Sequence, residues 1–304
     1  MAPTIKNVAL AGATGQLGSR ILTALVNLGH FNITILTRNA APTSFPEGVI
    51  TREVDYTSTE SLVDAIRGQD AVIDSTHSYE SEGPRRLLDA CVEVGVYRYI
   101  PPEFGSDPIS PDVQALPFFR RKTEIAKYRA EKLKGSSLTW TAVACGPFLE
   151  AIEDGGLGID VEAKKIAWYG EDGHLVSPFS TLEAVGKATA QVLLYPEETA
   201  NRVVYISSVN IGQRRLVELA KEALGSDGWI ENIVDIQDEY EWAQAKLRKG
   251  EFKQEVIMAI LRYSMTSAAH TYTWPKSDNA LLGVEEFSDA EVKEFVLKSA
   301  GVVA

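Results

Sequence analysis

The chain has 304 residues, with 30 lysines and arginines against 42 aspartates and glutamates, so its formal net charge is −12. This acidic balance disfavours binding to nucleic acid or to an anionic membrane surface, because both carry negative charge themselves. The chain has only two cysteines and no metal-ligand pattern, which predicts a protein without disulfides or bound metal. It also has no apolar run long enough to cross a bilayer, so we expect a cytoplasmic protein without membrane contact.

The first half of the chain alternates β-rich runs with amphipathic helical patterns, as is typical of a parallel sheet covered by helices. The predicted strands are 5–11, 32–37, 49–54, 71–75, 97–100 and 138–144. The predicted helices are 15–28, 57–67 with a capping box between Thr57 and Glu60, 82–94 and 117–134. Residues 1–150 are therefore expected to form a Rossmann-like, doubly wound α/β domain that binds a dinucleotide.

The second half of the chain, residues 151–304, has a looser pattern with glycine-rich turns at 155–158 and 170–173. A capped helix is predicted from residue 180 to 194, and a strand at 203–207. The chain is therefore expected to return to the sheet near 181–209, and the rest of this half to form a smaller α+β substrate lobe.

A glycine-rich turn lies between the first predicted strand and the first predicted helix. Amides at a helix start can face a pyrophosphate, and glycines allow the tight turn, the approach of the phosphates and the close packing of the helix on the strand. A turn of the same kind without a ligand is the alternative. The cofactor-binding residues expected here are Gly12, Thr14, Gly15, Gln16, Leu17 and Gly18.

Polar residues that follow the next three predicted strands extend this site. Arg38 stands where an NAD-specific domain places an acidic residue, which favours the 2′-phosphate of NADPH, although surface arginines are also common at strand ends. Asp55 could bind the adenine or cap the following turn. Ser75, Thr76 and His77 follow the fourth strand and are expected to line the dinucleotide, with a solvated loop as the alternative for His77.

Three features of the sequence resemble the isoflavone reductase-like and NmrA-like branch of the atypical short-chain dehydrogenases. They are the glycine turn followed by Arg38, the motif Tyr99-Ile100-Pro101-Pro102-Glu103-Phe104-Gly105, and the pattern Phe119-x-x-Lys122-x-x-Ile125. The segment Trp140 to Phe148 resembles the fungal members of this group. The chain departs from the family pattern at Pro102, Ala126 and Gly146, which stand in place of a serine, an arginine and an asparagine.

The resemblance implies that Lys122 is the catalytic residue and also contacts the cofactor. It further implies that Pro147 and Phe148 lie near the nicotinamide, and we expect Phe104, Phe118 and Phe148 to line the substrate site. Ordinary short-chain dehydrogenases use a Tyr-x-x-x-Lys pair, but the residue four before Lys122 is Phe118, so Lys122 would handle the proton alone or through water.

Two other patterns near Lys122 offer alternatives to its catalytic role. Tyr128 and Lys132 form a literal Tyr-x-x-x-Lys pair, but it comes nearly two helical turns later and is interpreted as a solvated helix face. Lys122 could also be one more basic residue after Arg120 and Arg121, although Phe118 and Ile125 place apolar surface around it, as is typical of reactive lysines.

These features predict an NADPH-dependent reductase that transfers hydride to a conjugated or aromatic small molecule, as a monomer or homodimer. The alternatives are an NmrA-like regulatory protein that senses dinucleotide without catalysis, and an isomerase that retains its cofactor. The tryptophans beyond residue 150 could line an aromatic pocket or belong to the core, and they are Trp168, Trp229, Trp242 and Trp274.

Overall fold

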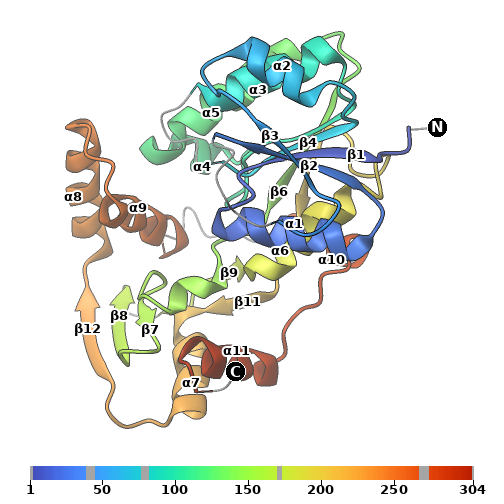
Figure 1. The fold of residues 1–304 in the computed structure, drawn as a ribbon. Helices are drawn as coiled ribbons and strands as arrows, with labels where there is room; N and C mark the ends of the chain where they lie inside the picture. Colours follow the sequence, from blue (N-terminus) through green and yellow to red (C-terminus); the bar gives the residue numbers. More distant parts are fainter. Residues whose placement is uncertain (1–2, 39–44, 77–81, 170–172, 267–273, 303–304) are drawn as a thin grey trace.

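A computed structural model of the protein describes residues 3–38, 45–76, 82–169, 173–266 and 274–302. At its centre is a seven-stranded sheet in which every neighbouring pair is parallel, with the order β10-β6-β5-β4-β1-β2-β3 (Figure 1). Its strands are β1 (Asn7–Ala11), β2 (Asn32–Thr37), β3 (Ile50–Glu53), β4 (Ala71–Asp74), β5 (Arg98–Ile100), β6 (Thr139–Ala144) and β10 (Arg202–Tyr205). This is the predicted Rossmann-like α/β architecture, and the predicted strand at 203–207 is the one that joins the sheet beside β6.

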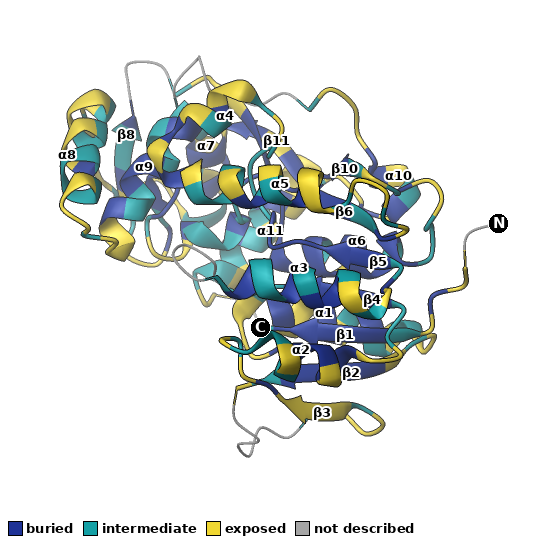
Figure 2. Ribbon diagram, turned by 90° about the horizontal axis from the view of Figure 1, so that it is seen from above, coloured by how far each residue is buried: buried dark blue, intermediate teal, exposed yellow. Residues whose placement is uncertain are grey.

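Helices cover both faces of the sheet, so its inner strands are buried on both sides (Figure 2). Val8 and Leu10 of β1 pack into one core, whereas Ala9 and Ala11 pack into the other, which explains why these strands appear in the sequence as continuous apolar runs. One face carries α1 (Gln16–Leu28), α6 (Leu182–Val192) and α10 (Asn279–Leu282). The opposite face carries α2 (Thr59–Ile66), α3 (Gly83–Val94) and α5 (Arg120–Lys132).

The ends of these helices follow from local chemistry. Gly29 and Gly95 end α1 and α3 in the left-handed conformation, as expected of C-terminal glycines. The predicted capping box at Thr57 and Glu60 is wrong, because Ser58 caps α2 by accepting a hydrogen bond from the Ser61 amide. Thr181 likewise caps α6 through the Ala184 amide.

The predicted helix at 117–134 is divided in the structure. Leu116 has an extended backbone, as residues before proline prefer, and it separates α4 (Pro111–Ala115) from the 3₁₀ turn η1 (Pro117–Phe119). The α-helix α5 then begins at Arg120. This break lets the side chains of Phe118 and Phe119 turn into a core shared with distant helices.

The rest of the chain forms the smaller α+β lobe, which lies below the sheet in Figure 1 except for α8 and α9 at its left. It contains a two-stranded antiparallel sheet and a three-stranded sheet of order β12-β8-β7. Its elements are η2 (Leu149–Ile152), β7 (Ile159–Asp160), β8 (Lys165–Tyr169), β9 (Val176–Phe179), β11 (Val209–Gly212), α7 (Gln213–Leu224), β12 (Ile230–Val234), α8 (Ile236–Arg248), α9 (Gln254–Thr266) and α11 (Asp289–Ser299). In the described residues, no helix is both long and apolar enough to cross a membrane.

Candidate active site

The glycine turn after β1 is built from two glycines that the fold requires and one that it does not. Gly12 has a φ of +83°, and a Cβ there would lie 2.7 Å from the Ser75 carbonyl oxygen. A Cβ on Gly18 would lie 2.0 Å from the Gly12 carbonyl oxygen, so only glycine lets α1 approach the turn this closely. Gly15 has an ordinary extended backbone, and a Cβ there would meet only the Gly12 oxygen at 3.3 Å.

The free amides at the start of α1 lie next to Gly15, which provides no side chain to cap them. Unpaired amides at a helix N-terminus favour an anion such as a phosphate. The absence of a side chain at Gly15 leaves space against these amides, and a Cβ there would fit only if the Gly12 carbonyl oxygen shifted slightly. The turn therefore fits the pyrophosphate of a dinucleotide.

A large cleft lies at the carboxyl edge of the sheet, over the ends of β1, β2, β3 and β4. Its volume is about 1020 Å³. The structure brings seven of the predicted cofactor residues to its walls, namely Gly12, Thr14, Gly15, Arg38, Asp55, Ser75 and Thr76. Gln16, Leu17 and Gly18 belong to the first turn of α1 and are not among its lining residues, and His77 lies outside the described residues.

Several polar side chains in the cleft are already bound to the protein. Asp55 accepts hydrogen bonds from the amide and hydroxyl of Thr57, so it caps the following turn, and these bonds lower the pKa of its carboxyl. The Ser75 hydroxyl donates to the Ala11 carbonyl at 2.6 Å. Thr76 donates to Asp74, a buried carboxyl whose pKa is raised by burial. These contacts fix the walls of the cleft, whereas Arg38 is exposed at the end of β2.

An apolar cavity of about 200 Å³ lies beyond the ends of β5 and β6, at the same carboxyl edge of the sheet. The loops after these strands contribute Phe104 and Phe148, and η1 and α5 contribute Phe118 and Lys122. Pro147 also lines this cavity. The structure therefore gathers Lys122 and all three predicted substrate residues around one space, whereas neither Lys122 nor Pro147 lines the cleft.

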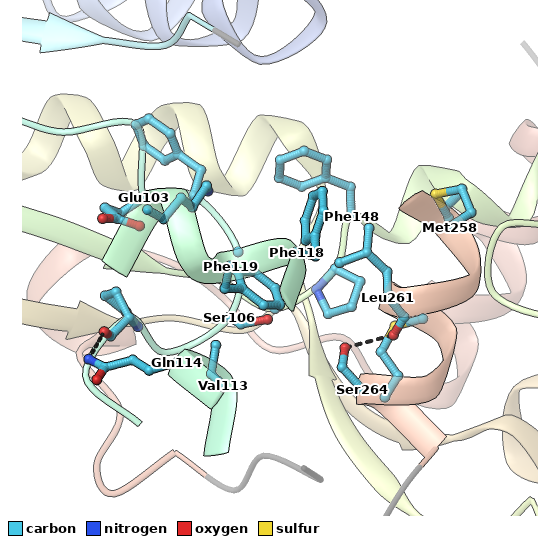
Figure 3. A pocket seen from close by; sticks show the side chains of 18 of the residues that line it. Glu103, Ser106, Val113, Gln114, Phe118, Phe119, Phe148, Met258, Leu261 and Ser264 are labelled. Carbon is cyan, nitrogen blue, oxygen red and sulfur yellow. Dashed lines mark hydrogen bonds between the residues drawn. The ribbon is translucent and has the colours of Figure 1, made fainter. Parts of the chain in front are cut away.

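Helix α9 closes the other side of the apolar cavity through Met258, Leu261, Ser264 and Met265. Figure 3 shows the rings of Phe118, Phe119 and Phe148 between Glu103 on one side and the α9 side chains on the other. These α9 residues could not be predicted from the sequence, because no motif marks a helix more than 130 residues after Lys122. Glu103 was not predicted as a site residue either, although it belongs to the motif Tyr99 to Gly105.

Titratable groups in and around the apolar cavity interact electrostatically with Lys122. Glu103 is 5% exposed, and burial raises the pKa of its carboxyl, while the cations of Lys122 and Arg129 oppose that shift. Burial also raises the pKa of the Cys145 thiol to about 12, again opposed by Lys122. Lys122 is thus the basic group that lines this space, and no tyrosine is among the described residues that line it.

The alternative tyrosine-lysine pair is engaged elsewhere. The Tyr128 hydroxyl donates to Asp89 at 2.6 Å, and Lys132 pairs with the same carboxylate at 2.8 Å. Both side chains therefore join α5 to α3 on the covered face of the sheet, and neither lines the apolar cavity. The interpretation of this pair as a solvated helix face holds for Lys132, which is exposed, but is wrong for Tyr128, which packs half-buried against the core.

Comparison with known proteins identifies the family. The model of the NmrA-like family matches residues 4–233. The chain belongs to the NmrA-like family. It is 33% identical over 250 residues to the oxidoreductase aprR of Aspergillus flavus, covering 81% of this chain and 83% of that protein. It is 26% identical over 214 residues to phenylcoumaran benzylic ether reductase PT1 of Pinus taeda, covering 66% of this chain and 68% of that protein.

Solved structures share the fold of this NmrA-like protein. The binary complex of leucoanthocyanidin reductase and NADPH from Vitis vinifera aligns with a TM-score of 0.76 at 18% identity, covering 96% of this chain and 99% of that one. A crystal structure of isoflavone reductase aligns with a TM-score of 0.74 at 21% identity, covering 96% and 100%. At these identities the likeness shows the architecture.

The tryptophans beyond residue 150 of this NmrA-like protein serve mainly in packing. Trp168 and Trp229 pack against the lobe core, Trp242 is exposed, and Trp274 packs against Tyr205 with its ring tilted by 48°. In the described part of the chain, none of the four lines the apolar cavity, whose surface comes from phenylalanines and methionines. Of the two alternatives, a place in the core therefore holds for Trp168, Trp229 and Trp274.

Proposed function

We propose that this NmrA-like protein is an NADPH-dependent reductase that acts on a conjugated or aromatic small molecule. The observation that best supports this function is that the cleft and the apolar cavity lie at the same edge of one parallel sheet. The cleft lies over β4, β1, β2 and β3, and the cavity with Lys122 lies over the adjacent β5 and β6. Ligands of such sheets bind at the carboxyl ends of the strands.

The residues of the cleft fit NADPH along its length. The amides beside Gly15 would hold the pyrophosphate, and Arg38 would pair with the 2′-phosphate as a charge-assisted fork. The adenine half would then lie toward β2 and β3 and the nicotinamide half toward β5 and β6. The names of the relatives support this assignment, since leucoanthocyanidin reductase is described in complex with NADPH.

The apolar cavity fits an aromatic or conjugated substrate of modest size. Phenylalanine rings at positions 104, 118 and 148 exclude water and offer faces and edges for stacking. When bound, NADPH supplies the hydride. Lys122 provides the positive charge that stabilises the oxygen of the substrate as it becomes negative, and its ammonium donates the proton that completes the reduction.

We also propose that residues 1–150 form the cofactor-binding part and that most of 151–304 forms the substrate lobe. Helices α6 and α10 and strand β10 are the exceptions, since they pack on or join the sheet. Helix α9 would complete the substrate site from the lobe, because it lines the cavity opposite Glu103.

A substrate screen tests the proposed function. Enones, quinone methides and aromatic carbonyls are incubated with the protein and NADPH, and loss of NADPH absorbance is followed. We expect oxidation with members of one class. Tight NADPH binding without oxidation by any compound would favour a regulatory dinucleotide sensor, and conversion of a compound without net NADPH consumption would favour an isomerase.

A further inference from the structure

Glu103 is a buried carboxyl that the proposed function leaves without a task. It follows β5, lines the apolar cavity that contains Lys122, and is 5% exposed. A carboxyl group is costly to bury unless its charge is compensated. Its presence in a largely apolar wall therefore requires a physical reason.

The nearest guanidinium compensates this charge only in part. Arg129 of α5 lies 3.9 Å from the Glu103 carboxylate, which is beyond hydrogen-bond distance. The guanidinium stacks instead on the Trp140 ring at 4.3 Å, and its Nη1 has no hydrogen-bond partner among the described residues. Arg129 thus supplies positive charge without binding both carboxylate oxygens.

Lys122 lines the same cavity as Glu103. Lys122 and Arg129 are seven residues apart on α5, which is close to two full turns, so the two cations lie on one face of the helix about 10 Å apart along its axis. Among the described residues Arg129 forms an ion pair with Glu103, whereas Lys122 acts on it across the cavity, and both cations lower the pKa of Glu103 against the effect of burial. The other titratable groups around this cluster in the described residues include Tyr99 of β5, Cys145 after β6 and Glu150 of η2, and burial raises the pKa of each.

We propose that Glu103 is the positioning residue of Lys122, because its carboxylate attracts the ammonium across the cavity and keeps it directed at the substrate. This inference rests on the proposed function.

Competitive labelling of lysines tests this pair without NADPH or substrate. The folded protein is treated with a trace of acetic anhydride, which reacts with neutral amines, and the labelling of Lys122 is measured against that of Lys127 by mass spectrometry. Lys127 is exposed on the same helix and serves as the internal reference. The Glu103→Gln variant keeps the shape of the side chain but cannot carry charge.

The matched control variant is Glu124→Gln. Glu124 is a carboxylate of the same helix that pairs with Arg120 and Arg121 at the surface. Loss of the Glu103 charge should raise the Lys122 to Lys127 labelling ratio about threefold or more, since tenfold more neutral amine corresponds to one pKa unit. The control should leave the ratio within about twofold of the unmodified protein. An unchanged ratio in folded Glu103→Gln would overturn the proposal.

If Glu103→Gln does not fold, the same labelling is carried out on the unmodified protein over a range of pH. As the pH rises and Glu103 loses its proton, the Lys122 to Lys127 ratio should fall, and a ratio independent of pH would contradict the pairing.

With a substrate in hand, Glu103→Gln should lower kcat about tenfold or more and change its pH profile, while leaving NADPH affinity unchanged. Unchanged kcat and an unchanged profile would refute the positioning role. If no substrate is turned over but the labelling ratio responds, the proposed function fails and the pairing stands.

Discussion

Alanine substitutions at Gly15 and Gly18 should separate cofactor binding from folding, although the two residues are only three positions apart. A methyl group at Gly15 would touch the Gly12 oxygen at 3.3 Å in a backbone conformation that alanine adopts freely. Gly15→Ala should therefore change the free energy of unfolding by no more than about 0.5–1 kcal/mol. It would, however, occupy the space next to the free amides of α1.

The expected loss of NADPH affinity follows from those amides. A hydrogen bond to a charged acceptor contributes about 1.5–3 kcal/mol, so losing one phosphate contact weakens binding about 10- to 150-fold. Gly18→Ala should instead lower the free energy of unfolding, because its methyl would lie 2.0 Å from the Gly12 oxygen. Such overpacking costs about 1–3 kcal/mol, or about 2 °C of Tm for each kcal/mol.

Urea unfolding and calorimetric titration with NADPH measure the two effects on the same samples. We expect Gly15→Ala to unfold like the unmodified protein while binding NADPH weakly, and Gly18→Ala to unfold more easily. Undiminished NADPH affinity in Gly15→Ala would show that the turn does not receive the pyrophosphate. Equal stability of Gly18→Ala would show that the close approach of α1 is not required.

Three further predictions concern single side chains. Arg38→Ala should reduce the preference for NADPH over NADH about tenfold or more, as measured by titration of both cofactors, and equal affinities in the unmodified protein would exclude the assignment. Lys122→Ala should lower kcat about 10²- to 10⁴-fold with NADPH affinity changed less than about tenfold, and normal turnover would refute the mechanism. Lys122→Arg should also fail, because a guanidinium does not give up its proton. Burial raises the pKa of Asp278, but the Arg202 guanidinium and the Tyr205 amide outweigh it and lower the pKa below the ordinary value of 3.8. The stability that Asp278 contributes is therefore complete above that value and lost as the pH falls through the lowered pKa, so urea titrations should show a weaker acid dependence in Asp278→Asn.

The sequence by itself determined the strands, the glycine turn and several helix ends, because their causes are local. β1 alternates between two cores, so Val8 to Ala11 form a continuous apolar run. Gly12 provides the positive φ of the turn and Gly18 lies against the Gly12 carbonyl oxygen, both within one strand-turn-helix unit, whereas the contact of Gly12 with Ser75 after β4 depends on the tertiary structure. Gly29 and Gly95 end their helices for reasons that involve only the neighbouring turn. The Lys122 segment could be recognised through the resemblance of Phe119-x-x-Lys122-x-x-Ile125 to the family motif.

The sequence could not predict the other residues around Lys122, because they come from segments far apart in the chain. The walls of its cavity come from the loops after β5 and β6 and from α9, and no local pattern relates Met258 or Leu261 to a lysine on another helix. The break at Leu116 turns Phe118 and Phe119 into a core shared with α8 and α9. Glu103 likewise looks like an ordinary loop glutamate until the fold buries it beside the cations of α5, because burial and charge compensation depend on packing between segments distant in sequence.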